Sequence, residues 1–137
     1  MVEISFPLEF WLEGVPVSLQ ASARSKEFWK GRVSAAAENA LAKGHGATHG
    51  PVGVTIYYFP DARMEGDLDN ILKPILDALG QVVYVDDQQV ERIVVQKFEP
   101  GGASGFVDPS SVLIEAMEAA GPRVYLRIDS DAVRGDE

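Results

Sequence analysis

Aspartates and one lysine are concentrated between residues 67 and 87, and together they could bind a cation and a phosphate. Asp67 and Asp69 stand at the entry of an apolar-periodic segment, Lys73 follows within it, and Asp87 arrives from a later turn. Carboxylates that cluster without histidine or cysteine suit Mg²⁺, a hard cation that prefers oxygen ligands. Such a cation would offset the repulsion between the carboxylates and let an anionic phosphodiester approach. The pattern therefore predicts a metal site at the rim of one helix.

Each of these residues also has a purely structural interpretation. Asp67 could cap the helix, a contact worth about 1 kcal/mol. Asp69 and Lys73 have the acid-before-base spacing of a helical ion pair, worth about 0.2–0.5 kcal/mol. Asp86 and Asp87 could be turn residues. Spacing alone leaves both interpretations open.

The segment 68–79 carries the clearest helical signal in the chain. Its apolar residues recur at the spacing of one helix face. Pro74 removes one backbone hydrogen bond, so we expect a kink or a helix start near residues 70–73. Gly80 is expected to end the helix, and Asp77 is expected to be a solvated side chain. The apolar positions are Leu68, Ile71, Leu72, Ile75, Leu76 and Leu79.

The remaining periodicities predict one domain of the α/β class, of the α+β type. Strands are expected over 2–10, 52–59, 82–85, 90–98 and 124–128, and helices over 26–43 and 110–119 in addition to 68–79. The order β-α-β-α-β-β-α-β indicates a mixed sheet with two or three helices packed on it. The domain is expected to span 1–129, followed by a polar, frayed tail over 130–137.

Composition excludes several classes of protein. The 137 residues include no cysteine, which excludes disulfides, thiolate metal sites and cysteine nucleophiles. The two histidines, His45 and His49, lie in a glycine-rich loop, where a spacing of four has no helical meaning. No apolar run reaches the length of a membrane span, and no secretory signal opens the sequence, so a cytoplasmic protein is expected.

Charge is unevenly distributed along the chain. The net charge of −9 opposes loose binding to nucleic acid, because phosphates are repelled by such a surface. Residues 24–43 nevertheless carry five basic and two acidic side chains, whereas residues 61–99 carry four basic and nine acidic ones. One stretch could face phosphates while the other holds cations, although both could equally be solvated faces.

Residues 67–79, followed by residues 85–90, resemble the core of the RusA family of Holliday-junction resolvases. The shared pattern is D-x-D-N-x-x-K-x-x-x-D-x-L and then D-D-x-x-V. The resemblance implies a homodimeric Mg²⁺-dependent endonuclease that cuts four-way DNA junctions, with Mn²⁺ as the expected substitute and no membrane partner. It assigns catalysis to Asp67, Asp69, Lys73 and Asp87.

The same resemblance assigns metal binding to the three catalytic aspartates, with Asp86 as a further candidate ligand. Lys73 would hold the scissile phosphate or stabilise charge that develops on it. DNA contacts would fall mainly on the basic side chains of the first helix and on Ser18 and Gln20 in the loop before it. Those basic side chains are Arg24, Lys26, Lys30 and Arg32.

Two other functions remain open at this point. A metal-dependent hydrolase of a small nucleotide phosphoester would keep the metal site and change the substrate, which suits the acidic surface. A non-catalytic dimeric DNA-binding module would bind junctions without cutting them. Metal-dependent turnover of a nucleotide would distinguish the first alternative, and unchanged junction binding after Asp→Asn substitutions would distinguish the second.

Overall fold

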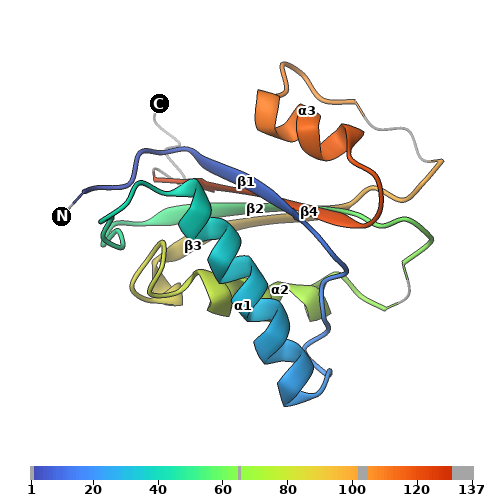
Figure 1. Cartoon of the computed structure of the whole chain (residues 1–137), viewed down its shortest axis with the longest axis horizontal. Coiled ribbons are helices and arrows are strands. Elements are labelled where there is room, and N and C mark those ends of the chain that lie inside the picture. Colours follow the sequence, from blue (N-terminus) through green and yellow to red (C-terminus); the bar gives the residue numbers. More distant parts are fainter. Residues whose placement is uncertain (1, 65, 102–104, 131–137) are drawn as a thin grey trace.

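A four-stranded mixed sheet organises the computed structural model, which describes residues 2–64, 66–101 and 105–130 (Figure 1). Two long helices lie on one face of this sheet and a short helix lies on the other. The elements are β1 (Leu8–Glu13), α1 (Ala23–Ala40), β2 (Val52–Phe59), α2 (Asp69–Leu79), a single 3-10 turn (Asp87–Gln89), β3 (Val90–Lys97), α3 (Ser111–Glu118) and β4 (Arg123–Asp129).

The strand order β1-β4-β2-β3 makes α2 a crossover helix. β4 pairs antiparallel with both β1 and β2, whereas β2 and β3 are parallel. Parallel neighbours cannot be joined by a hairpin, so the chain must cross the sheet face between them, and α2 makes this crossing. The crossover returns the chain from the end of β2 to the start of β3. The aspartate-rich segment therefore lies on α2 and on the turn that precedes β3.

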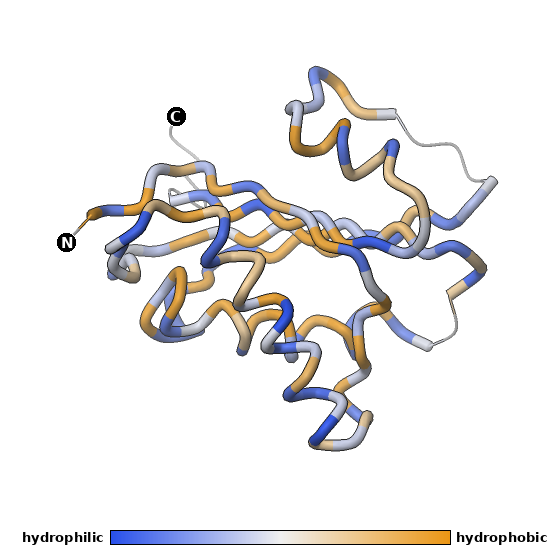
Figure 2. The backbone as a smooth tube through the Cα atoms, in the orientation of Figure 1, coloured by the Kyte–Doolittle hydropathy of each residue, from blue (hydrophilic) through white to orange (hydrophobic). Residues whose placement is uncertain are grey.

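The core lies between the sheet and the two long helices. In Figure 2 many residues of the inner strands and of α2 have the colour of hydrophobic residues. The apolar stripe of α2 is buried as predicted: Ile75 and Leu79 are completely buried and Ile71 is nearly so. α1 contributes Trp29 and Val33. Each such aliphatic side chain contributes about 1.5–3 kcal/mol when it leaves water, so hydrophobic burial holds α2 against the sheet.

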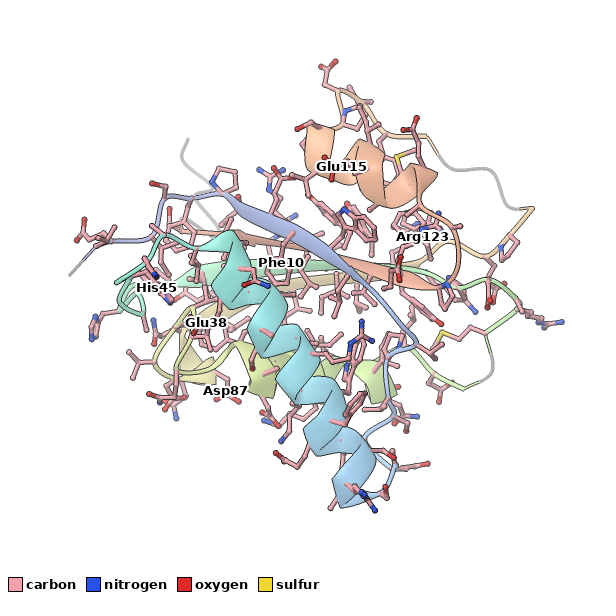
Figure 3. All side chains as sticks on the ribbon, viewed as in Figure 1. Phe10, Glu38, His45, Asp87, Glu115 and Arg123 are labelled. Atoms are coloured by element: carbon pink, nitrogen blue, oxygen red, sulfur yellow. The ribbon has the colours of Figure 1, made fainter. Side chains whose placement is uncertain are left out.

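A second apolar cluster lies on the opposite sheet face under α3. It consists of Phe59, Leu113, Ala116 and Tyr125. Figure 3 shows Glu115 and Arg123 on this side, whereas Asp87 lies on the side of α1 and α2. The aspartate-rich segment is therefore separated from α3 by the sheet.

Pro74 lies inside α2 and leaves a carbonyl free for another segment. A residue with an N–H at position 74 would donate to the oxygen of Asn70, but proline has no N–H. The Leu19 N–H donates to this oxygen instead, at 2.7 Å. The helix begins at Asp69, close to the predicted start. The Asn70 carbonyl that Pro74 leaves free thus binds the loop between β1 and α1 to the N-terminal end of α2.

The fold class and the order of elements predicted from the sequence are confirmed. Residues 82–85, expected as a short strand, pair only through isolated bridges that Tyr84 makes with Thr48 and Gly80. The first strand begins at Leu8, and among the described residues before it Val2 alone forms a bridge, with His45.

α1 begins three residues before its predicted start because Ser22 caps it. Of the predicted tail, residues 131–137 lie outside the described residues. Within the described ranges, no helix is both long enough and apolar enough to cross a membrane.

Candidate active site

Lys73 is the centre of a small ion-pair cluster on the exposed side of α2. Its Nζ lies 2.8 Å from Oδ1 of Asp77 and 3.1 Å from Oδ2 of Asp87. Asp77 is one turn further along the same helix, whereas Asp87 comes from the turn before β3. All three side chains remain between one third and one half exposed, so the cluster is accessible to a ligand.

The contact between Lys73 and Asp87 favours the charged forms of both residues. The pKa of Lys73 is raised, first by its hydrogen bond to Asp77 and then by that to Asp87. The pKa of Asp87 is lowered, first by its hydrogen bond to Lys73 and then by that to Asp86. The stabilisation from the pair is therefore lost as pH falls through the lowered pKa of Asp87, or as pH rises through the raised pKa of Lys73. At neutral pH a protonated ammonium faces an ionised carboxylate.

Replacing Asp77 with asparagine should move the pKa of Lys73 towards its ordinary value, because the largest cause of its upward shift is removed. Titration followed by NMR at the Lys73 side-chain carbon next to the ammonium would measure this. Asp69→Asn is the matched control, since Asp69 makes no ion pair with Lys73 in the described part of the chain. An equal downward shift in both variants would contradict the arrangement of the cluster.

The turn that carries Asp87 is held by a reciprocal cap. Oδ1 of Asp86 accepts the Gln88 N–H at 2.9 Å, and the Gln89 side chain accepts the Asp86 N–H at 2.9 Å. This S/T/D-x-x-Q type of arrangement satisfies donors that a turn start would otherwise leave unpaired. The structural interpretation of Asp86 as a turn residue is thus supported, while Asp87 projects to Lys73.

Asp67 and Asp69 lie at the N-terminal end of α2, where both are exposed. The helix has Leu68 at its N-cap and no side-chain cap, so Asp67 does not cap it. Asp69 is the acidic residue of the first turn, where the helix dipole favours negative charge. The structural roles that sequence spacing allowed for these two aspartates are therefore not used: neither the cap nor the ion pair with Lys73 forms.

A groove of about 420 Å³ opens beside Asp67. It is lined by the loop after β1, including Ser18 and Gln20, by residues 60–64 and Gly66, and by the start of α2. Tyr58 lines this groove, and burial raises the pKa of its hydroxyl. A predicted metal ligand therefore lines the groove together with Asn70, whose carbonyl oxygen accepts the Leu19 N–H.

The donor chemistry of the three predicted ligands fits Mg²⁺, because Asp67, Asp69 and Asp87 offer only carboxylate oxygens. Their arrangement is open: among the described residues no three acidic or histidine side chains form a group ready to hold a metal ion. Asp69 and Lys73 are one helical turn apart, and Lys73 spans the distance to Asp87. The three aspartates thus supply suitable ligand atoms, but among the described residues they are not gathered into one metal-binding group.

The four predicted DNA-binding residues all lie on α1, but they do not form one free basic surface. The ammonium of Lys26 donates to the oxygen of Leu19 at 3.0 Å, and Lys30 pairs with Glu27 at 3.0 Å. The Arg32 guanidinium lies over the Trp29 ring, 5.8 Å from its centroid, and Arg24 is exposed. Only part of the basic stretch is directed to solvent.

Of the predicted catalytic residues, the structure brings Lys73 and Asp87 into contact and leaves Asp67 and Asp69 along the helix before them. Two participants were not predicted from the sequence. Asp77 was expected to be solvated, although its spacing of four residues after Lys73 was the signal for this contact. Gln89 was not singled out, although an aspartate followed three residues later by glutamine is the sequence signature of a capping box.

The chain matches the model of a known protein family. The family model described as endodeoxyribonuclease RusA matches residues 19–105, which is more than half of the chain. This range contains α1, β2, α2, the turn and β3, and thus every predicted catalytic and metal-binding residue. No curated protein matches the chain.

Proposed function

The chain belongs to the RusA endodeoxyribonuclease family, and from this we propose that it is an Mg²⁺-dependent endonuclease selective for branched DNA. The observation that carries the proposal is the contact between Lys73 and Asp87, because the two motif segments that contain them are separated in the sequence. A four-way junction is the proposed substrate. A two-fold homodimer would suit it, since two equivalent sites would face symmetry-related strands.

We assign metal binding to Asp67, Asp69 and Asp87, with Asp86 as a further candidate ligand. A bound Mg²⁺ would lower the pKa of a water molecule and offset negative charge on the phosphate; Mn²⁺ would substitute for it. Asp86 already uses one oxygen in the turn, so it is the weaker candidate.

Lys73 has the chemistry needed to bind the scissile phosphate. Its ammonium is held by two carboxylates and is only lightly buried, so a phosphate oxygen can replace one carboxylate as its partner. A positive charge placed there before the reaction stabilises negative charge that develops on the phosphate oxygens. Asp77 would keep the ammonium in place during this exchange.

The test uses a labelled four-way junction and a linear duplex of matched sequence, each with and without Mg²⁺ or Mn²⁺. We expect metal-dependent cleavage of the junction and little cleavage of the duplex. Turnover of a nucleotide phosphoester with intact junction would favour the small-molecule hydrolase instead. Junction binding without cleavage in either metal would favour the non-catalytic module. Either result would overturn the proposal.

A further inference from the structure

The side chain of Gln89 uses its full hydrogen-bonding capacity. Its Oε1 accepts the N–H groups of Val85 and Asp86, each at 2.9 Å. Its Nε2 donates to the carbonyl oxygens of Thr48 and Gly50, at 2.8 and 2.9 Å. A carboxamide has two acceptor sites and two N–H donors, so all four are satisfied.

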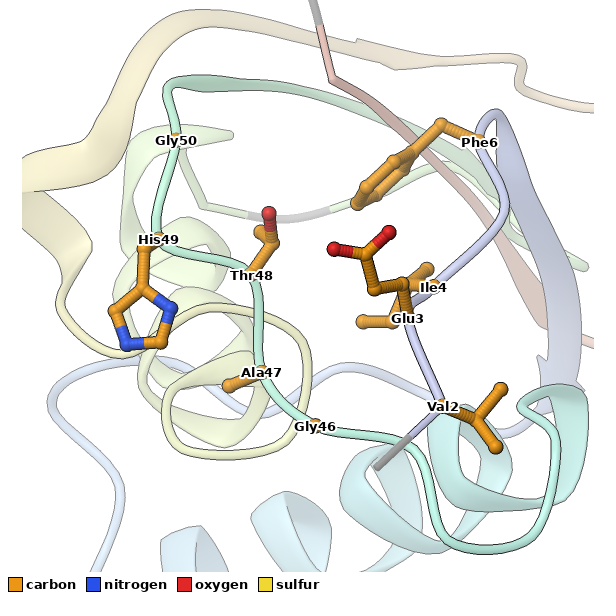
Figure 4. Close-up of a pocket in the computed structure, with 9 residues that line it drawn as sticks. All are labelled: Val2, Glu3, Ile4, Phe6, Gly46, Ala47, Thr48, His49 and Gly50. Carbon is orange, nitrogen blue, oxygen red and sulfur yellow. The ribbon is translucent and has the colours of Figure 1, made fainter.

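These four bonds join two segments that are distant in the sequence. One is the turn over residues 85–89, which carries Asp87; the other is the loop between α1 and β2. Figure 4 shows residues 46–50 of this loop facing Val2, Glu3, Ile4 and Phe6 across a pocket. The volume of this pocket is about 580 Å³. The loop is anchored in turn by the Thr48 N–H, which donates to the oxygen of Val83 at 2.8 Å.

The turn is otherwise held by short-range bonds: Nε2 of Gln81 donates to the oxygen of Val85 at 2.8 Å, and Oδ1 of Asp86 accepts the Gln88 N–H at 2.9 Å. It is a single 3-10 turn of three residues, none of them buried. The ion pair with Lys73 connects Asp87 to α2, but an exposed ion pair contributes little rigidity. The amide of Gln89 links the backbone on the N-terminal side of Asp87 to a loop that packs against the same segment.

We infer that Gln89 is a positioning residue that fixes the turn carrying Asp87 at the candidate site. The expected effect of Gln89 on cleavage rests on the proposed function, whereas its role in holding the turn does not. A carboxylate that must meet a cation and a phosphate has to be held to within about 0.5 Å. Groups that orient such ligands typically change activity or metal affinity by about 10–100-fold when they are removed.

The test compares Gln89→Met with Gln88→Met, its matched control. Both replace a glutamine in the same turn with an unbranched side chain of similar length, and Gln88 makes no side-chain hydrogen bond in the described part of the chain. Amide hydrogen exchange at Val85 and Asp86, thermal unfolding, and the kcat and KM of junction cleavage are measured for each.

For Gln89→Met we expect exchange at both amides to accelerate at least about tenfold, and kcat to fall about 10–100-fold with KM nearly unchanged. Gln88→Met should match the unaltered protein. Gln89→Glu is the second variant, should the first fail to fold. It still accepts the two turn N–H groups, but its carboxylate faces the two loop carbonyl oxygens, so kcat should also fall.

Unchanged exchange and unchanged kcat in a folded Gln89 variant would overturn the inference. An equal loss of protection throughout the protein would do the same, because it would mark a general loss of stability. If the unaltered protein cleaves no junction, the proposed function fails, and the exchange measurements still decide whether Gln89 holds the turn.

Discussion

Lys73→Met should lower kcat for junction cleavage by about 100-fold or more, the loss typical of removing one preorganised group that stabilises a developing oxyanion. Methionine keeps most of the aliphatic length and removes the charge. Asp77 and Asp87 would then face each other without the ammonium that joins them. Single-turnover cleavage at saturating Mg²⁺ would measure the loss in the chemical step.

Lys97→Met is the matched control for this substitution. Lys97 also pairs with a carboxylate, Glu99, at 3.0 Å, and its exposure is comparable, but it lies at the end of β3. Neither variant should lose much stability, since exposed ion pairs contribute about 0–1 kcal/mol. A Lys73→Met protein that cleaves within about threefold of the unaltered rate would remove Lys73 from the catalytic residues.

Asp69→Asn should also reduce cleavage by about 100-fold or more, because a metal site typically supplies several kcal/mol of charge stabilisation and a ligand is lost. Asparagine has nearly the same shape, and Asp69 is exposed, so the fold should be retained. The substitution removes one favourable charge near the start of α2, a cost of about 0.3–1 kcal/mol. Mg²⁺ binding followed by calorimetry should weaken in parallel with cleavage.

Asp108→Asn provides the control for Asp69→Asn. Asp108 is equally exposed but lies beside α3, across the sheet from the site. Its backbone has φ of 49°, a conformation that asparagine tolerates well. Normal cleavage and normal Mg²⁺ affinity in Asp69→Asn would contradict its assignment as a ligand, whatever the behaviour of the control.

Most of the fold could be predicted from local patterns. The stripe of α2 and the alternation along β2 arise from residues a few positions apart, and those positions are related by the geometry of the element itself. The strand expected over 82–85 shows the limit of this reasoning. Val83 and Tyr84 are completely buried, as their apolar character indicates, but burial alone does not decide whether a segment joins a sheet.

The candidate site was predictable only in part. Sequence spacing placed Asp69, Lys73 and Asp77 along one helix, but it did not predict which carboxylates form ion pairs with Lys73. Within the helix, the acid-before-base spacing favoured Asp69 over Asp77, whereas the structure pairs Lys73 with Asp77. The choice of Asp77 and Asp87 depends on where the turn before β3 lies relative to α2, which is a property of the packed chain.

The sequence by itself determined which residues could do chemistry, the helix and strands that carry them, and the family to which the chain is related. Only the tertiary structure decided that Asp87 meets Lys73, that Leu19 occupies the carbonyl freed by Pro74, and that Gln89 ties the acidic turn to a loop some 40 residues earlier. Local periodicity reports the geometry of neighbours along the chain. Contacts between distant segments are set by the joint packing of all elements, which no single stretch of sequence encodes.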